Sequence, residues 1–244
     1  MKDLHDILIN LVGGVLVAAL DRLIIYINKT FKAYRFKKIF GQQIESFHIV
    51  YGTMILKPEY TSKDKFPYLK PSTNGLFNMT RPVSFAETRG AKYLSESFSK
   101  LVGQSTRLTS DEEIKEKVDI TYCSLGGLNN LKTVDILNSK ENIFLGFDLT
   151  APGSIINKKN KSNIYTIDGV YDYGLIIKIN NRLFPTRTQI CVAGLGEWGT
   201  SGASWFLANK WKDLLKVAGD KEFGAIIKVK GGVDESAELM EVVT

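Results

Sequence analysis

Two glycine-rich turns contain the residues whose types and spacing are best suited to chemistry. Each turn follows a short apolar run, DITYCS or QICVA, and precedes a segment with helical periodicity. Glycine lets the backbone turn sharply and approach a ligand, and a helix N-terminus offers free N–H groups to a phosphate. The candidate ligand-binding residues are therefore Gly126, Gly127, Asn129, Asn130 and Thr133 in the first turn, and Gly194, Gly196, Glu197, Gly199, Thr200 and Ser201 in the second.

The second turn matches the dinucleotide-binding pattern G-x-G-x-x-G at Gly194, Gly196 and Gly199. An apolar strand before the match and a helix after it strengthen this interpretation. The acidic residue expected about 20 positions further on, at the end of the next strand, is absent, because that strand ends at Lys230. The sequence thus excludes an ordinary NAD-dependent dehydrogenase fold. Two interpretations stay open: a phosphate or ribose pocket, or turns that are merely tight.

Three further side chains near these turns have alternative roles. Trp198 is placed either to stack on a base or to pack in the core beside Trp205 and Phe206. Glu87 and Arg89 either point into the same cleft or lie on a solvated helix face, which is the usual position of charged side chains. We expect the solvated face for this pair.

Conventional catalytic and metal-binding patterns are missing from the sequence. His5 and His48 are its two histidines, and no Ser-His-Asp set, CxxC pair or HExxH motif occurs. We therefore expect neither a metal nor a cofactor. A carboxylate-only mechanism stays open, in which members of the set Glu87, Asp148 and Glu197 act as paired carboxylates to cleave a glycosidic bond.

The N-terminal region predicts a membrane anchor. Ile7–Ile27 is an apolar run interrupted by Asp21 and Arg22, and as a helix it just spans a hydrocarbon core of about 30 Å. Five basic residues and no acidic one follow between positions 29 and 38, and such clusters stay on the cytoplasmic side. We predict a single-pass protein of the inner (plasma) membrane with a cytoplasmic C-terminal domain. An interfacial helix, a buried core helix and a cleaved signal peptide are the alternatives.

The distribution of charge and of small residues indicates the partners. The net charge is +6, and almost all of it lies in the short basic block, which favours membrane lipid over nucleic acid as a partner. Asn10, Gly13, Gly14, Val17 and Asp21 form a small or polar stripe along the predicted span. Such stripes let membrane helices associate closely, so we expect a homo-oligomer. The alternative for the aspartate is a position among the lipid headgroups.

The elements that position these residues alternate between strands and helices. This alternation predicts an α/β fold, with a Rossmann-like mixed, mostly parallel sheet and helices on both faces, preceded by one N-terminal transmembrane helix. Residues 1–41 form the anchor and basic juxtamembrane helix, and residues 42–244 form the cytosolic ligand-binding domain. Strands are predicted over 47–56, 119–124, 142–149, 189–193 and 223–230, a hairpin over 164–168 and 174–179, helices over 31–40, 82–102 and 200–217, a long loop over 57–80 and a frayed tail from 231.

The chain resembles the membrane-anchored, Rossmann-like sensor or effector proteins of bacterial antiphage defence. The resemblance rests on LINLVGGVLVAAL near the start, SLGGLNNLKT in the middle and AGLGEWGTSGA near the end. It implies that a nucleotide signal, recognised in the cytosol, changes the state of the membrane helix.

The leading functional hypothesis is a membrane-anchored cytosolic domain that binds a nucleotide-like small molecule and couples it to the membrane helix. One alternative is a membrane-tethered nucleoside or NAD glycosidase that uses Glu87 or Glu197. Another is a scaffold without a ligand. Carboxylates that converge on the cleft would favour the enzyme, whereas free backbone N–H groups with Asn, Ser and Thr would favour binding.

Overall fold

The computed structural model describes residues 2–54, 83–148, 150, 153–160 and 164–244, with side chains described from Gly14 onward. The helices are α1 (Lys2–Phe40), α2 (Phe85–Val102), α3 (Asp111–Ile114), α4 (Leu131–Asn138), α5 (Glu197–Asn209) and α6 (Trp211–Ala218), with a 3-10 turn at Ile44–Ser46. The strands are β1 (His48–Tyr51), β2 (Arg107–Ser110), β3 (Tyr122–Leu125), β4 (Leu145–Asp148), β5 (Ser154–Asn157), β6 (Ile164–Tyr165), β7 (Tyr171–Asn180), β8 (Thr188–Gly194), β9 (Phe223–Lys230) and β10 (Val233–Val243).

A mixed seven-stranded sheet with the order β10-β9-β7-β8-β3-β1-β2 forms the centre of the molecule. The strands β2, β1, β3 and β8 run parallel to one another, whereas β7 pairs antiparallel with both β8 and β9, and β9 pairs antiparallel with β10. The predicted α/β class with a mixed sheet is confirmed. The sheet is only partly parallel, because short connections join β7 to β8 and β9 to β10, and short connections produce antiparallel hairpins.

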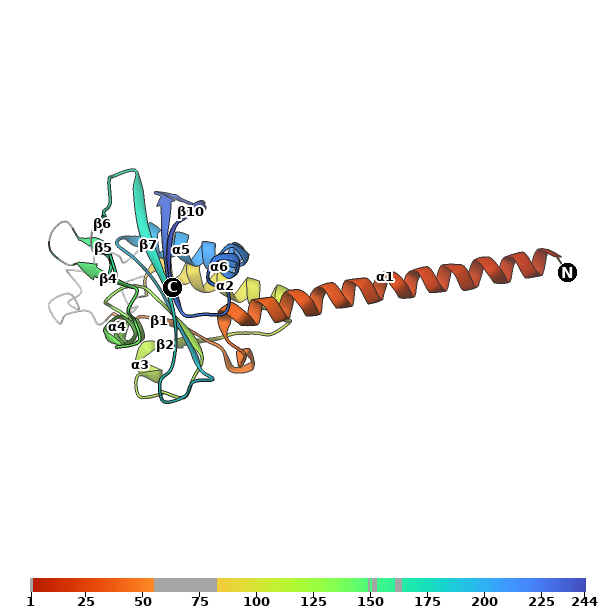
Figure 1. Ribbon diagram of the computed structural model, residues 1–244, viewed down its shortest axis with the longest axis horizontal. Coiled ribbons are helices and arrows are strands. Elements are labelled where there is room, and N and C mark those ends of the chain that lie inside the picture. The colour runs from red at the N-terminus through yellow and green to blue at the C-terminus, as the bar shows by residue number, and fades with distance from the viewer. Residues whose placement is uncertain (1, 55–82, 149, 151–152, 161–163) are drawn as a thin grey trace, which may run out of the picture.

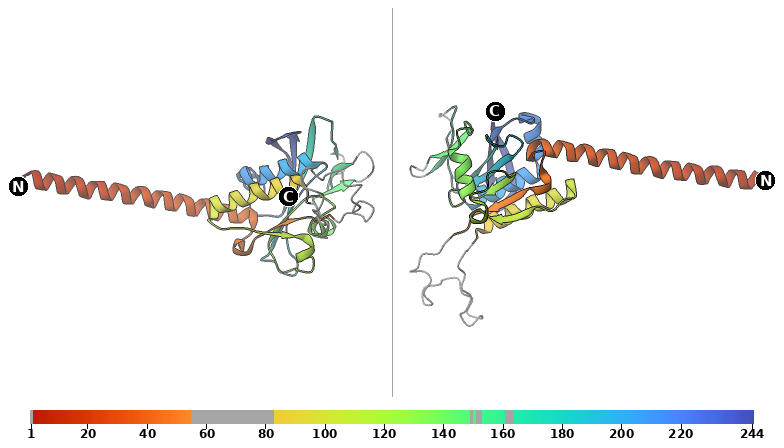
Figure 2. Two further views of the ribbon diagram at one scale, coloured as in Figure 1. Left: turned by 180° about the vertical axis from the view of Figure 1, so that it is seen from behind. Right: turned by 90° about the horizontal axis from the view of Figure 1, so that it is seen from below.

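Helices cover both faces of this sheet, because each strand alternates its side chains between two apolar clusters. Ile49 belongs to the cluster beneath α2, α5, α6 and the end of α1. Its neighbour Val50 belongs to the cluster on the opposite face, with α4 and the small sheet β4-β5-β6. Figures 1 and 2 show these layers on either side of the central strands. Cys123 and Cys191 are buried free thiols.

The last turn of α1 is part of the folded domain. Phe36 and Phe40 are fully buried, and each of their rings lies 5.0 Å from the ring of Phe98 on α2. The helix ends at Gly41, whose φ of +96° is one that L side chains rarely adopt. This confirms the predicted helix end. The predicted domain boundary at residues 41 and 42, however, runs between these phenylalanines and the core that they fill.

The rest of α1 projects away from the domain (Figure 1). In the part of the chain whose side chains are described, no helix is both long enough and apolar enough to cross a membrane. Residues 7–13 of the predicted span, which include Asn10 and Gly13 of its stripe, lie outside that part. From Val15 to Ile27 the large apolar side chains are exposed by 51–67%.

Local signals for helix ends are confirmed. Helix α2 has Ser84 as its N-cap residue and Gly103, with φ of +70°, as its C-cap. Ser110 and Glu113 form a reciprocal capping box at α3, within the sequence Ser110-Asp111-Glu112-Glu113, which has the Ser-x-x-Glu pattern of such a box. The predicted helix over 200–217 is instead two helices, α5 and α6. Lys210, with φ of −112° and ψ of 15°, is not helical and separates them.

Several predictions about strands are wrong. The tail from residue 231 is not frayed, because β10 pairs with β9 along its length. The predicted hairpin of 164–168 with 174–179 does not form: β6 pairs with β5, and β7 lies between β8 and β9. Strand β2 escaped prediction, because its sequence RLTS has a single large apolar residue and two of its four residues are exposed. The predicted loop at 57–80 lies outside the described residues.

Candidate functional site

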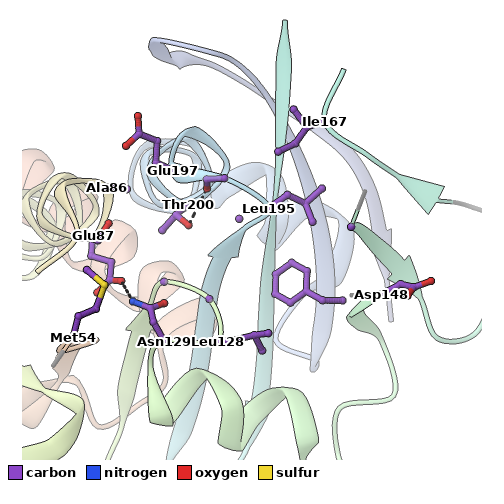
Figure 3. A pocket seen from close by; sticks show the side chains of 17 residues that line it. Met54, Ala86, Glu87, Leu128, Asn129, Asp148, Ile167, Leu195, Glu197 and Thr200 are labelled. Atoms are coloured by element: carbon purple, nitrogen blue, oxygen red, sulfur yellow. Dashed lines mark hydrogen bonds between the residues drawn. The ribbon is translucent and has the colours of Figure 1, made fainter. Parts of the chain in front are cut away.

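The two glycine turns open into one cavity of about 460 Å³ (Figure 3). They meet because β3 and β8 are parallel neighbours, with Leu125 in register with Val192. Gly126 N donates to Val192 O at 3.0 Å and joins the first turn to the second strand. Parallel strands end at one sheet edge, which is where open α/β sheets bind ligands.

The structure brings together seven of the eleven predicted site residues. The predicted residues that line the cavity are Gly126, Gly127, Asn129, Gly194, Gly196, Glu197 and Thr200. The described lining is completed by residues absent from that prediction: Met54, Ser84, Ala86, Glu87, Leu128, Phe147, Asp148, Gly153, Ile167 and Leu195. Asn130, Thr133, Gly199 and Ser201 do not line it.

In the first turn, Asn130 and Thr133 hold the backbone from behind. Asn130 Oδ1 accepts the N–H groups of Lys132 and Thr133 at 3.0 and 3.4 Å. Its Nδ2 donates to the carbonyl oxygens of Val50 and Leu125. Both Asn130 and Thr133 are fully buried. At the start of α4, therefore, the asparagine side chain caps these two N–H groups, and they are not free to bind a phosphate.

In the second turn, a carboxylate of this chain occupies the position predicted for a phosphate. Asp172, on β7, accepts Gly196 N at 3.1 Å and Gly199 N at 2.7 Å. The negative charge suits the N-terminus of α5. Ser201 points away from the cavity and donates to Asp234 at 2.6 Å.

The glycines of the second turn are required by space. A Cβ on Gly194 would overlap Thr200 N, one on Gly199 would overlap the Tyr173 carbonyl, and one on Gly196 would lie 2.6 Å from Asp172 Oδ2. None of these three glycines has a positive φ. Tight packing thus explains the G-x-G-x-x-G spacing here without a ligand.

Glu87 is buried at the cavity rather than solvated, so the expected helix-face position is wrong for this residue. Its side chain comes from the first turn of α2 and exposes 1% of its surface. Oε2 accepts Gly52 N at 2.7 Å, and Oε1 accepts Asn129 Nδ2 at 2.8 Å (Figure 3). The carboxyl packs directly on the backbone of Gly126, where a Cβ would overlap Oε1.

Burial raises the pKa of Glu87 to about 7, while the bonds from Asn129 and Gly52 oppose that rise. Desolvation disfavours the charged form of a carboxylate, and hydrogen bonds to it favour that form. The group can therefore gain or lose a proton near neutral pH. That property suits both recognition of hydroxyl groups and acid-base chemistry.

The other two carboxylates of the lining do not converge on Glu87. Figure 3 shows Asp148 and Glu197 at separate edges of the cavity, directed away from the Glu87–Asn129 pair. Asp148 Oδ1 accepts the N–H and the hydroxyl of Thr150 at 2.9 and 2.7 Å. The arrangement presents one inward carboxyl rather than a pair.

Arg89 and Trp198 form a separate cluster beside the cavity. The guanidinium lies 4.8 Å from the centre of the Trp198 ring and pairs with Asp234 at 2.5 Å. Asp234 is fully buried and also accepts the hydroxyl of Tyr93 at 2.7 Å. Trp198 packs against the apolar cluster that contains Phe206, as the core alternative predicts. These residues hold β10 against α2 and α5.

Sequence reasoning missed Asp172 as the carboxylate that caps α5. The only local signal was an acidic residue between two tyrosines in an apolar strand, YDYG. Within the described parts of the chain, no group of three or more His, Cys, Asp or Glu residues is arranged to hold a metal ion. Comparisons of the chain with protein-family models, with curated proteins and with solved structures find no match.

Proposed function

We propose that the cavity binds a nucleoside-like small molecule and that binding is coupled to α1. The observation that carries this proposal is the hydrogen bond between the buried Glu87 and the exposed Asn129, at the carboxyl ends of β1 and β3. A carboxyl and an amide together accept and donate hydrogen bonds, and an acidic residue at such strand ends is the group that holds ribose hydroxyls in nucleotide-binding folds.

The charge of the cavity favours a sugar over a phosphate as the recognised part. The described lining contains the acidic Glu87, Asp148 and Glu197 and neither lysine nor arginine. The turn N–H groups of Gly196 and Gly199 already bind Asp172. The carboxylates would repel an added phosphate, whereas they would not repel a neutral ribose and would attract a cationic nicotinamide riboside.

Helix α2 provides the route from the cavity to α1. Glu87 lies in the first turn of α2, and Phe98 lies in the C-terminal half of the same helix. The Phe98 ring contacts Phe36 and Phe40 at the end of α1. A ligand that displaces α2 therefore alters the packing that holds α1, which is the direct contact that a sensor needs.

The proposal includes the membrane anchor. Apolar side chains on every side of α1, such as Leu16, Val17 and Ile25, are more than half exposed, and a helix that is apolar all round is typically buried in a core or in lipid. The basic block that follows suits the cytoplasmic surface of the inner membrane. In this arrangement α1 self-associates through Gly14 and Asp21.

Binding is tested by mass spectrometry of small molecules that co-purify with the full chain, followed by calorimetry with adenosine, AMP and NAD. Glu87→Gln should weaken binding of the retained compound at least tenfold. Glu96→Gln, an exposed substitution on the same helix, should leave binding unchanged. Equal affinity in both variants would remove Glu87 from the site. No co-purifying compound and no heat with any of the three probes would contradict the binding proposal.

The anchor is tested separately. After carbonate extraction the full chain should stay in the membrane pellet, and release into the supernatant would contradict the anchor. Gly14→Ile should weaken cross-linking between copies in membranes, because a large side chain blocks close approach. Unchanged cross-linking would contradict the association stripe while leaving the anchor intact.

A second candidate function rests on the pKa of Glu87. A buried carboxyl with a pKa of about 7 is able, in its protonated form, to protonate a leaving adenine and, in its ionised form, to take a proton from the water that attacks the ribose carbon. Nicotinamide leaves NAD as a neutral ring, so for that substrate the group would serve only the water. The enzyme would then be a membrane-tethered nucleoside or NAD glycosidase. Chromatographic detection of free nicotinamide or adenine tests this, and the release should vanish in Glu87→Gln. Absence of release from the wild type, with binding retained, would leave the binding function alone.

A further inference from the structure

A basic, aromatic groove lies where α1 leaves the folded domain, far along α2 from the Glu87 end. It comprises two adjoining cavities of about 450 and 340 Å³. Their shared walls include Lys32 of α1 and Lys100 of α2. The remaining residues used below, which complete what we call the basal groove, are Lys29, Tyr93, Trp205, Trp211 and Lys212.

The lysines of the basal groove have no acidic partner in the part of the chain that the structure describes. Within the described residues, no carboxylate lies within 4.0 Å of the ammonium groups of Lys29, Lys32, Lys100 or Lys212. Glu96, the acidic residue in the described lining, pairs outward with Lys92 at 3.8 Å. Three separate helices thus bring positive charge to one hollow, where Lys212 lies over the Trp211 ring with its ammonium 5.8 Å from the ring centre.

The groove continues directly into the apolar part of α1. Ile25 lines the smaller of the two cavities, the one of about 340 Å³. Further along α1, Ile27 and Phe31 are exposed by 55% and 59%. Figures 1 and 2 show α1 leaving the domain beside α2 and α6, the helices that supply Lys100 and Lys212. Tryptophan, tyrosine and lysine are the residues that gather at the boundary between lipid tails and water.

We propose that the basal groove binds the phosphate headgroup of an anionic phospholipid. The inference rests on the proposed anchoring, because the headgroup layer lies against Lys29–Lys38 only when the apolar part of α1 is in the bilayer. Lysine binds phosphate as a point charge, and basic residues next to a membrane helix attract anionic lipid. The bound lipid would bridge α1 and α2, the same two helices that connect the cavity to the anchor.

Energy transfer from tryptophan to labelled lipid tests the groove in the full chain. The protein is reconstituted into phosphatidylcholine vesicles that carry a trace of dansyl-labelled phosphatidylglycerol or, in matched vesicles, dansyl-labelled phosphatidylcholine. The test variant carries Lys100→Gln and Lys212→Gln. The matched control carries Lys117→Gln and Lys140→Gln, which remove two exposed lysines near α3 and α4 on the opposite face of the sheet.

We expect wild type and control to prefer the anionic lipid. Each lysine at an anionic surface contributes a roughly fivefold gain in association, so the test variant should lose roughly 25-fold in preference. Failure of the anchor appears as absence of co-flotation with either vesicle, and it overturns this inference too. Co-flotation with equal transfer to both lipids overturns the headgroup site alone. Loss of preference in the presence of millimolar inorganic phosphate, or of a short RNA duplex, would assign the lysines to a soluble phosphate or to nucleic acid and overturn the lipid.

Discussion

Replacement of Glu87 by glutamine should change how the stability of this protein depends on pH. The pKa of Glu87 rises from its ordinary value of 4.5 to about 7 in the folded chain, chiefly through burial. The folded protein therefore holds this proton more tightly than the unfolded chain does. The resulting stabilisation is complete below about pH 4.5 and is lost as the pH rises through about 7.

The magnitude follows from that difference. At about 1.4 kcal/mol per pH unit, the ionisation of Glu87 lowers the free energy of unfolding by about 3 kcal/mol between pH 4.5 and pH 8. Glutamine does not titrate, so this decline should be missing from Glu87→Gln. The variant also leaves one acceptor fewer for Gly52 N and Asn129 Nδ2, which costs about 1–3 kcal/mol at every pH.

Denaturant unfolding of wild type and variant at half-unit steps from pH 5 to pH 8 measures both effects. The pH-independent cost places the curve of the variant below that of the wild type. Ionisation of Glu87 lowers the stability of the wild type alone as the pH rises, so the difference in free energy of unfolding shifts in favour of the variant. Glu96→Gln, exposed on the same helix, should run parallel to the wild type. Parallel curves for Glu87→Gln as well would refute the raised pKa, and with it the acid-base candidate function.

Three more outcomes follow from the packing. Asp172→Ala should lower the free energy of unfolding by about 2–4 kcal/mol, because it leaves two N–H groups at the N-terminus of α5 without their acceptor. Denaturant midpoints of wild type and variant measure the loss, and a loss below about 0.5 kcal/mol would contradict this prediction. Gly126→Ala should cost more stability than Gly127→Ala, because Gly126 has φ of +94° and no room for a Cβ. A Cβ on Gly127 would lie 4.0 Å from its nearest neighbour, the Gly194 carbonyl oxygen. Similar melting temperatures for the two variants would contradict this prediction. A chain starting at Gln42 should fail to fold, because it lacks the buried phenylalanines at the end of α1. A chain starting at Lys29 should keep the cooperative unfolding transition of the domain, although it loses the helical signal of residues 2–28. A folded Gln42 chain would show that these rings are dispensable.

Sequence alone determined the features of this protein that depend on neighbouring residues. Gly41 and Gly103 end helices because their positive φ is cheap only for glycine, and Ser110 starts one because its side chain reaches an N–H three residues on. The sharing of one edge by the two glycine turns also followed, because it needs only that β3 and β8 be parallel. These features follow from local backbone preferences or from strand direction, and both can be predicted from the order of residue types in the sequence.

Tertiary structure alone decided what each polar residue at that edge does. Asp172 and Gly199 are far apart in the chain, yet their contact fills the position that a phosphate would take. Glu87 has the sequence environment of a surface helix, but β1 and the first glycine turn enclose it and raise its pKa. The burial of a charge depends on which distant segments pack around it, and a periodicity of apolar residues along one helix does not contain that information.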